Sequence, residues 1–432
     1  MEVQKYRKAG GLESYCIFSN ELNQMGLVAV SARYSVNITR EILYPALAEV
    51  IKSEPLLGVN VFKRPNKGKK KRYFRKISTV NLDRVVQFLP DQSLESFCDE
   101  FFTIRTPYFD DALPLWRIFV LGDREVVWGF NHGPFDGNSG SFFHERLVKQ
   151  LGVVNSLESP IVPTSDKPIP PALTGILNIQ PSFRLMIKLL FKLVTKQLSP
   201  GSNVWLGSPA AKPVSSKTVV ASLDPEETII LIKRSKELKL SVSFILAACW
   251  IQTVLKELPK DKEGASINFN LIVDLRRFMD AEYTKALGNW VAPYEHSVSS
   301  VSANQGNVFA EAMARDFSVS LYRELSKVRS EMTSVTAFLD KIDIKDYLTH
   351  ASRSTVAELS NLGAKSLEGE KCRIEDMTFF QAATSTLATY TLSTVSVKGG
   401  RFNATIAVAL DDDKKSTGTR LKSHLLEALR NV

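Results

Sequence analysis

The segment VVWGFNHGPFDGNSG, residues 126–140, joins an apolar run to a helical pattern through a loop that contains one histidine and one aspartate. Val126 to Phe130 predict a short strand, glycines bound the loop, and a helical pattern is clear from Ser141 onward. A strand and a helix fix the two ends of such a loop, which makes it a good mount for a reactive side chain.

The loop carries His132 and Asp136 in the pattern H-x-x-x-D-G. Histidine is the side chain whose unshifted pKa lets it change protonation near neutral pH. The carboxylate of Asp136 is able either to orient the imidazole or to brace the loop. A histidine beside an aspartate on an ordinary surface gives the same pattern, so the pattern alone has low specificity. Its position at the end of a strand, between small residues, favours a functional site.

The chain has 432 residues, more than one ordinary core supports, so two domains or one large bipartite fold are expected. Its hydrophobic fraction, 44%, is that of a soluble globular protein. No run reaches the roughly 18–20 apolar residues of a membrane span, and the N-terminus lacks the apolar segment of a secretory signal. A cytoplasmic protein is therefore expected.

The cysteines and histidines predict neither a disulfide framework nor a metal site. No C-x-x-C pair and no H-x-x-x-H pair occurs, and isolated cysteines favour a reducing compartment. These scattered residues are Cys16, Cys98, Cys249, Cys372, His144, His296, His350 and His424.

The net charge of +9 arises from one segment. Lys63 to Lys76 contain nine basic residues and no acidic one, and without them 46 basic residues balance 46 acidic ones. The plain interpretation is a solvated hairpin loop. A nuclear-import signal, a membrane-surface patch or a grip on the phosphates of a ligand are the alternatives. Nucleic acid is not an expected partner, because no nucleic-acid fold signature accompanies the patch.

The element pattern predicts a mixed α/β fold of two similar lobes, with boundaries at residues 1–158 and 214–432. Between them, residues 159–213 form a proline-rich crossover. Inside it, Phe183 to Leu198 predict an amphipathic helix with one basic stripe, formed by Arg184, Lys188, Lys192 and Lys196. This helix either packs on the body of the protein or lies on an anionic membrane or lipid droplet.

Local signals predict several elements on both sides of this crossover. Alternating or apolar runs predict strands, and Asp224-Pro225-Glu226-Glu227 predicts a capped helix start. Gly122-Asp123 and Gly399-Gly400 mark hairpin turns. The expected strands are 27–34, 59–62, 72–77, 116–121, 126–130, 218–223, 267–273, 389–397 and 402–410, and the expected helices start near 39, 94, 225, 241 and 307, with one more at the end of the chain.

Five motifs in order resemble the CoA-dependent acyltransferase superfamily, which includes chloramphenicol acetyltransferase, the plant BAHD enzymes and condensation domains. Fungal alcohol O-acetyltransferases and their N-acetylating relatives are the most similar members. The motifs are Arg7-x-x-Gly10-x-Leu12-Glu13-x-Tyr15, Pro114-Leu115-Trp116-Arg117, His132-x-x-x-Asp136-Gly137, Asp274-Leu275-Arg276 with Gly288-Asn289, and Ser360-Asn361-Leu362-Gly363. The D-F-G-W-G signature of the plant enzymes is absent, and Phe379-Phe380-Gln381 or the Gly399-Gly400 turn takes its place.

The resemblance implies two chloramphenicol acetyltransferase-like lobes, each a mixed sheet flanked by helices, with a tunnel between them and His132 midway. It implies that His132 is the general base and that Asp136 points away from it to pair with Arg276, with Arg277 as the alternative. Gly133 and Gly137 are expected to allow backbone geometry that a Cβ would block. Candidate contacts to substrate or CoA are Asn289, Asn361, Gly363 and Gln381, and candidate oxyanion donors are Asn289 and the segment Ala383 to Thr394.

The reaction implied is direct transfer of an acetyl group from acetyl-CoA to an alcohol, with no covalent enzyme intermediate, no G-x-S-x-G nucleophile elbow and no permanently bound cofactor. Transfer to an amine of a toxin or secondary metabolite is the alternative, because one base serves both acceptors. A third possibility is a non-catalytic shell that retains the two lobes. The protein is expected to be a monomer, with possible peripheral attachment to a membrane or lipid droplet.

Overall fold

The computed structural model describes residues 6–63, 71–104, 113–153, 156–177, 179, 183, 186–187, 191, 203–207, 216–300, 311–326, 331–351, 353–408 and 414–432. Two expected features fall largely outside these residues. They are the tip of the basic segment between Lys63 and Lys76, and the basic stripe of Arg184, Lys188, Lys192 and Lys196.

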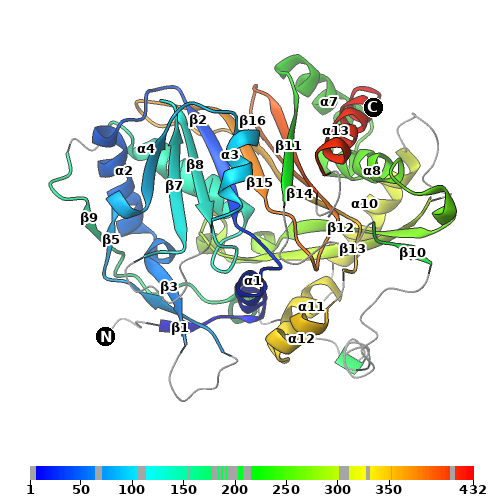
Figure 1. The fold of residues 1–432 in the computed structure, drawn as a ribbon, viewed down its shortest axis with the longest axis horizontal. Helices are drawn as coiled ribbons and strands as arrows, with labels where there is room; N and C mark the ends of the chain where they lie inside the picture. Colours follow the sequence, from blue (N-terminus) through cyan, green and yellow to red (C-terminus); the bar gives the residue numbers. More distant parts are fainter. Residues whose placement is uncertain are drawn as a thin grey trace.

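Two sheets covered by helices form two lobes, and their hydrophobic cores are separate. The N-terminal half of the chain forms most of one lobe, and the C-terminal half forms the other (Figure 1). The first sheet has the order β15-β2-β8-β7-β6 and mixes antiparallel with parallel pairing. Its strands are β15 Ile374–Gln381, β2 Val28–Tyr34, β8 Glu125–Phe130, β7 Trp116–Leu121 and β6 Val86–Leu89.

The second sheet has seven strands in the order β10-β12-β14-β16-β17-β11, and β13 pairs with β12. Its three central strands, β12, β14 and β16, run parallel, and the remaining long pairings are antiparallel. The strands are β10 Val204–Trp205, β12 Ser266–Asp274, β14 Ala357–Lys365, β16 Tyr390–Val397, β17 Phe402–Val408, β11 Lys217–Leu223 and β13 Val291–Ser299.

The smaller strands form a three-stranded sheet and a two-stranded sheet beside the first lobe. The hairpin expected around the basic segment is confirmed, because β3 and β4 pair antiparallel. These strands are β1 Tyr6–Lys8, β3 Val59–Phe62, β4 Tyr73–Lys76, β5 Thr79–Asn81 and β9 Ile161–Pro163.

Helices cover both sheets. In the first lobe, α4 packs on β2 and on α2, while α3 covers the opposite face through a phenylalanine cluster. The second sheet carries α7, α8, α10 and α13, and α1 packs with α11 and α12 where the lobes meet. The helices are α1 Gly11–Glu21, α2 Arg40–Ser53, α3 Leu94–Phe101, α4 Gly137–Gln150, α5 Leu173–Ile176, α7 Pro225–Glu237, α8 Val242–Leu255, α10 Glu311–Leu325, α11 Glu331–Leu339, α12 Ile344–His350 and α13 Lys414–Arg430, with short 3-10 turns at Pro55–Gly58, Leu82–Arg84, Lys260–Lys262, Leu275–Phe278 and Ala281–Tyr283.

The apolar run that precedes His132 is buried on both faces of the first sheet. Trp128 packs against Phe143 of α4, with ring centroids 4.5 Å apart. On the other face, Phe101 of α3 closes on Gly129 so tightly that an added Cβ would lie 2.4 Å from its ring. Coverage on both sides explains why β8 is apolar at nearly every position instead of alternating.

One strand crosses between the lobes. β15 belongs to the C-terminal half of the sequence, yet it forms the edge of the first sheet by pairing antiparallel with β2. The division at residues 158 and 213 assigns this strand to the second lobe, and its backbone hydrogen bonds correct that assignment. Thr405 of β17 also donates to the Phe379 carbonyl at 2.7 Å, so β15 is bonded to both sheets.

Candidate active site

The His132 loop is short and is held by hydrogen bonds from both lobes. It connects β8 to α4, which begins at Gly137, four residues before the expected start. Asn131 donates its backbone N–H to Leu115 O (2.9 Å) and accepts from the Gly133 N–H at its side-chain oxygen (2.8 Å). From the second lobe, Asn289 Nδ2 donates to the carbonyl oxygen of His132 at 2.5 Å. The histidine backbone is therefore fixed on two sides.

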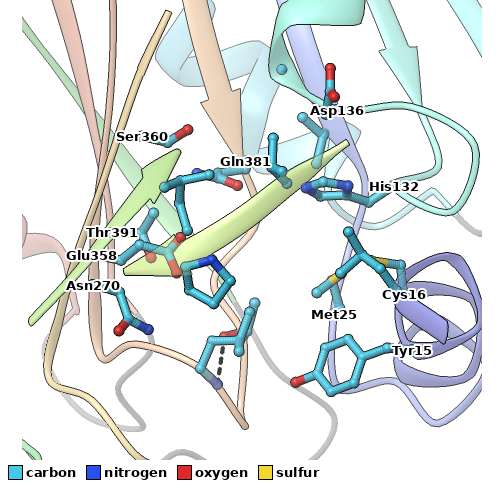
Figure 2. A pocket seen from close by; sticks show the side chains of 18 of the residues that line it. Tyr15, Cys16, Met25, His132, Asp136, Asn270, Glu358, Ser360, Gln381 and Thr391 are labelled. Carbon is cyan, nitrogen blue, oxygen red and sulfur yellow. Dashed lines mark hydrogen bonds between the residues drawn. The ribbon is translucent and has the colours of Figure 1, made fainter. Parts of the chain in front are cut away.

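The imidazole of His132 lines a cavity between the lobes (Figure 2). Its Nδ1 is buried, and within the described residues this atom has no hydrogen-bond partner. Nε2 is thus the nitrogen that is able to reach a molecule in the cavity. Burial lowers the pKa of His132 below its ordinary value, although backbone groups and the nearby Asp136 charge act in the opposite direction. The ring is neutral at pH 7 and is able to accept a proton.

The carboxylate of Asp136 turns away from the imidazole of His132 (Figure 2). Oδ1 accepts from the Ser139 N–H (2.9 Å) and hydroxyl (3.0 Å), which makes Asp136 the N-cap of α4. Oδ2 accepts from the Trp290 N–H at 3.0 Å. Both oxygens also accept from Arg276, at 2.8 and 3.1 Å.

The expected ion pair between Asp136 and Arg276 is therefore present, and both side chains are almost completely buried. Burial acts to raise the pKa of Asp136, but the Arg276 charge and the hydrogen bonds outweigh it, so the pKa is lowered. Arg276 also bonds Asp274 at 3.1 Å and lies over the Trp290 ring, 4.9 Å from its centroid. Arg277, the alternative partner, is exposed to solvent. The pair ties the loop of the first lobe to the second lobe.

The cavity has a volume of about 220 Å³ and takes its walls from both lobes. This volume is many times the roughly 10–15 Å³ that one water molecule requires, so a ligand has room to bind. One wall is the face of the second sheet, from Asn270, Ile272 and Asp274 of β12 to Thr391 of β16. The opposite wall comes from the His132 loop, α1 and β15.

Two of the four candidate contact residues line this cavity. Gln381 reaches it from β15, with Nε2 donating to Ser393 Oγ at 3.0 Å. Asn361 lines it from β14, while its side chain also bonds Ser243, Thr394 and the Gly363 N–H.

The other two candidates, Asn289 and Gly363, are not among the cavity-lining residues. Asn289 is 1% exposed and its amide donates to the His132 and Gly133 carbonyls, so in this structure it positions the loop. Gly363 has a φ of +76° at an irregularity in the pairing of β14 with β16. It is needed for this backbone conformation, which glycine adopts without strain.

Gly133 and Gly137 do not have the left-handed backbone conformation that favours glycine. Their constraint is space, because a Cβ at Gly137 would lie 2.8 Å from Leu362 and 2.9 Å from Phe379. A Cβ at Gly133 would lie 2.8 Å from Ile17. The prediction that these glycines allow a special backbone geometry is therefore wrong, and they are needed because neighbouring side chains pack too closely for a Cβ.

Several cavity residues escaped sequence reasoning. Tyr15 and Cys16 of α1 line the cavity on the same side as His132, and Glu358 lines the opposite side from β14. Burial raises the pKa of Cys16 to about 12, so this residue is a neutral thiol at pH 7. The first motif gave a usable signal for α1, because Arg7 and Glu13 form a two-bond ion pair (2.7 and 2.8 Å) that fixes the start of this helix. Glu358 had no such signal.

Within the described part of the chain, no group of three or more histidine, cysteine, aspartate or glutamate side chains is arranged to hold a metal ion. In the same residues, no helix taken alone has the length and apolar character to cross a bilayer. One bent pair, α7 with α8 at 106°, passes that test by length and composition.

Comparison with known proteins identifies relatives along nearly the whole chain. Residues 8–429 match the sequence model of the alcohol acetyltransferase family. An uncharacterized protein of Schizosaccharomyces pombe is 30% identical over 99% of this chain and 98% of its own length. The probable alcohol acetyltransferase crmB of Aspergillus fumigatus is 22% identical over 59% of this chain and 60% of its own.

Solved structures share the two-lobed fold. The trichothecene 15-O-acetyltransferase TRI3 from Fusarium sporotrichioides superposes with a TM-score of 0.73 at 11% identity, over 98% of this chain and 95% of its own. The condensation domain of the polyketide synthase MokA gives 0.64 at 10% identity, over 99% and 98%. The family match spans almost the complete sequence, and the chain therefore belongs to the alcohol acetyltransferase family and is an acyltransferase of a family that uses acyl-CoA and small-molecule acceptors.

Proposed function

We propose that the protein transfers an acetyl group from acetyl-CoA to the hydroxyl of an alcohol, with His132 as general base and with both substrates bound together. One observation carries this function. The imidazole lines a cavity between the lobes, while the nearby carboxylate of Asp136 is fully engaged with Arg276, Ser139 and Trp290. The Asp136 carboxylate is thus not bonded to the ring, and the ring is free to exchange a proton with a molecule in the cavity.

In the proposed reaction, neutral Nε2 of His132 takes the hydroxyl proton as the oxygen attacks the thioester carbonyl. A new C–O bond forms, and the carbonyl becomes a tetrahedral oxyanion. The C–S bond then breaks, and the imidazolium returns the proton to the departing CoA sulfur. General base catalysis contributes about 10²–10⁴-fold, and positioning of the two substrates supplies much of the remaining acceleration.

Direct attack is favoured over an acyl-cysteine intermediate at Cys16. A thiolate is the reactive form of cysteine, and burial raises the pKa of Cys16 to about 12. Cys16→Ala is expected to retain turnover within a few-fold. Loss of turnover together with an acyl adduct on Cys16 of the unmodified protein in mass spectrometry would overturn the direct route.

Acetyl-CoA is proposed to enter at the end of the cavity marked by Asp274 and Asn361. A second, more open cavity shares these two residues and is lined by Arg277 and by the first turn of α8. Lys365 lies close by, with Nζ donating to Asn138 Oδ1 at 2.9 Å, and burial lowers its pKa to about 8. Cationic side chains at this end suit the phosphates of CoA.

An amine acceptor is the second candidate, because the same neutral imidazole is able to take a proton from the attacking amine. A panel of acceptors separates the two. Purified protein mixed with acetyl-CoA and each alcohol or amine is expected to release free thiol in step with formation of the acetylated product. Absence of thiol release with alcohols and amines alike would contradict the function, and release with amines only would favour the second candidate.

We infer a cytoplasmic monomer that associates with membranes or lipid droplets through the segment around residues 183–191. Support comes from Phe183, Ile187 and Phe191, which are 81%, 53% and 62% exposed. Apolar side chains at this spacing form one face of a helix that is able to enter a lipid surface. Flotation with anionic liposomes is expected for the wild type and not for a Phe183→Glu, Ile187→Glu double variant. Wild-type protein that stays in solution would contradict the inference.

A further inference from the structure

Three polar side chains form a row across the sheet that walls the cavity. Asn270 of β12 is in register with Glu358 of β14, which is in register with Thr391 of β16. All three line the cavity and lie together in Figure 2, on the side away from His132. Neighbouring parallel strands at one register direct their side chains to the same face. This polar row of Asn270, Glu358 and Thr391 is therefore one feature of the cavity wall.

Glu358 is a buried carboxyl without a counter-charge. It is 6% exposed, and its side chain has no hydrogen-bond or ion-pair partner among the described residues. Burial raises its pKa to about 7. Beside it, Asn270 is 5% exposed, and its Oδ1 is also without a hydrogen-bond partner there. Burying such groups unpaired costs free energy, and sites of this kind are typical of ligand contacts rather than of packing.

The surroundings of Glu358 restrict what fills this space. Apolar side chains from other elements, among them Met25, Pro293 and Leu339, line the same cavity. Tyr15 and Tyr347 also line the cavity, and both are neutral at pH 7 because burial raises their pKa further above the ordinary value of 10.0. The described residues thus offer Glu358 no cation, and a ligand in this part of the cavity meets one carboxyl in an apolar setting.

The row lies at the opposite end of the cavity from the proposed CoA entrance. On β12 the cavity-lining residues are Asn270, Ile272 and Asp274, and the last two also line the second cavity, which includes Arg277. Four residues of strand span roughly 13 Å. His132 contacts the cavity from the facing lobe. An acceptor that presents one group to His132 is able to extend its other end to Glu358.

We propose that Glu358 and Asn270 form a recognition subsite for a hydrogen-bond donor carried by the acceptor at the end remote from the acylated group. The acceptor class is then an apolar molecule with two polar groups, such as a diol or an amino alcohol, and not a simple alkanol. This inference rests on the proposed function, because it assumes that the acceptor occupies this end of the cavity. A remote hydroxyl and a remote ammonium group are both hydrogen-bond donors to the carboxyl, and the variant Glu358→Gln distinguishes them.

The test compares three acceptors of one chain length, a 1-alkanol, the α,ω-diol and the amino alcohol, at saturating acetyl-CoA. Wild-type kcat/KM is expected to favour at least one bifunctional acceptor over the alkanol by about tenfold or more, the effect of one hydrogen bond to a charged group. Glu358→Leu is expected to abolish this preference. Glu358→Gln retains it for a hydroxyl and loses it for an ammonium. Glu370→Gln, a change at an exposed glutamate, is the matched control.

A stability measurement separates recognition from a structural role. Removing an unpaired buried carboxyl is expected to raise the Tm of Glu358→Leu, whereas a glutamate needed for folding would lower it. Equal acceptor ratios in the wild type and Glu358→Leu would overturn the inference while leaving the proposed function intact. If no acceptor releases thiol, the proposed function fails, and calorimetric titration of the diol into both proteins still tests the subsite. Equal diol affinity for both would overturn it.

Discussion

At the scale of single residues, His132 and Asp136 have separate tasks although they share one loop. A hydrogen bond donated by the ring N–H to the Asp136 carboxylate would stabilise the imidazolium, as in hydrolases with a Ser-His-Asp triad. Here the carboxylate instead bonds Arg276, Ser139 and Trp290. Burial is therefore the main influence on the pKa of the imidazole, and it lowers this pKa. A neutral ring is able to take the proton of the acceptor and return it to the CoA sulfur, whereas a ring that is already protonated cannot accept it.

The first prediction concerns removal of this ring. His132→Ala is expected to reduce kcat by about 10²–10⁴-fold with little change in KM for acetyl-CoA, because the proton transfer is lost and the binding surfaces remain. Initial rates of thiol release measure the effect. Circular dichroism and Tm of the variant are expected to match the wild type, since the ring lines a cavity and its Nδ1 has no hydrogen-bond partner among the described residues. Unchanged kcat would exclude His132 as the base.

The second prediction concerns pH. The base acts in its neutral form, so kcat/KM is expected to be constant near neutral pH and to fall as the pH drops through an apparent pKa below 6.5. An apparent pKa above 6.5 would contradict it. Loss of activity at low pH also arises if the protein unfolds, and His144 makes this a real alternative because burial lowers its pKa to about 4. A histidine with a depressed folded-state pKa loses its contribution to stability as the pH falls from about 6.5 towards 4. As the control, activity is expected to recover fully when the protein is returned to pH 7.

At the scale of elements, the sequence predicted what local signals determine. The hairpin of β7 and β8 follows from two apolar runs around Gly122, which has a φ of +59°. The start of α7 follows from Asp224, whose capping box with Glu227 is present. The pairing of β15 with β2 was not predictable, because it joins residues more than 300 positions apart through backbone bonds that no residue type marks. The position of Glu358 in the cavity wall was not predictable for a related reason, since it depends on the register of three strands.

The third prediction concerns the start of α4. Asp136→Ala removes the N-cap and leaves Arg276 buried without its partner, so a loss of about 3–5 kcal/mol in the free energy of unfolding is expected. Urea denaturation at pH 7 measures this change. Arg277→Ala, at the exposed neighbouring arginine, is the control and is expected to change it by less than about 0.5 kcal/mol. A loss below about 1 kcal/mol for Asp136→Ala would show that the pair does not brace the loop.

At the scale of the whole molecule, the catalytic loop depends on both lobes. Asp136 of the first lobe and Arg276 of the second are buried together, Asn289 of the second lobe holds the His132 carbonyl, and β15 is bonded to both sheets. Such connections couple the stability of the two sheets, even though their hydrophobic cores are separate. The cavity then keeps its shape only while both lobes are folded.

The last prediction tests this coupling by amide hydrogen exchange. Peptides from β8, in the first lobe, and from β12, in the second, are expected to exchange with the same free energy of opening, because the lobes unfold as one unit. Asp136→Ala is then expected to lower both values equally, by the 3–5 kcal/mol of the buried pair. Arg277→Ala, next to the pair in sequence but exposed, is expected to lower neither. If Asp136→Ala weakened protection in β8 and left β12 unchanged, the lobes would be independent folding units, and the position of His132 would depend on the first lobe alone.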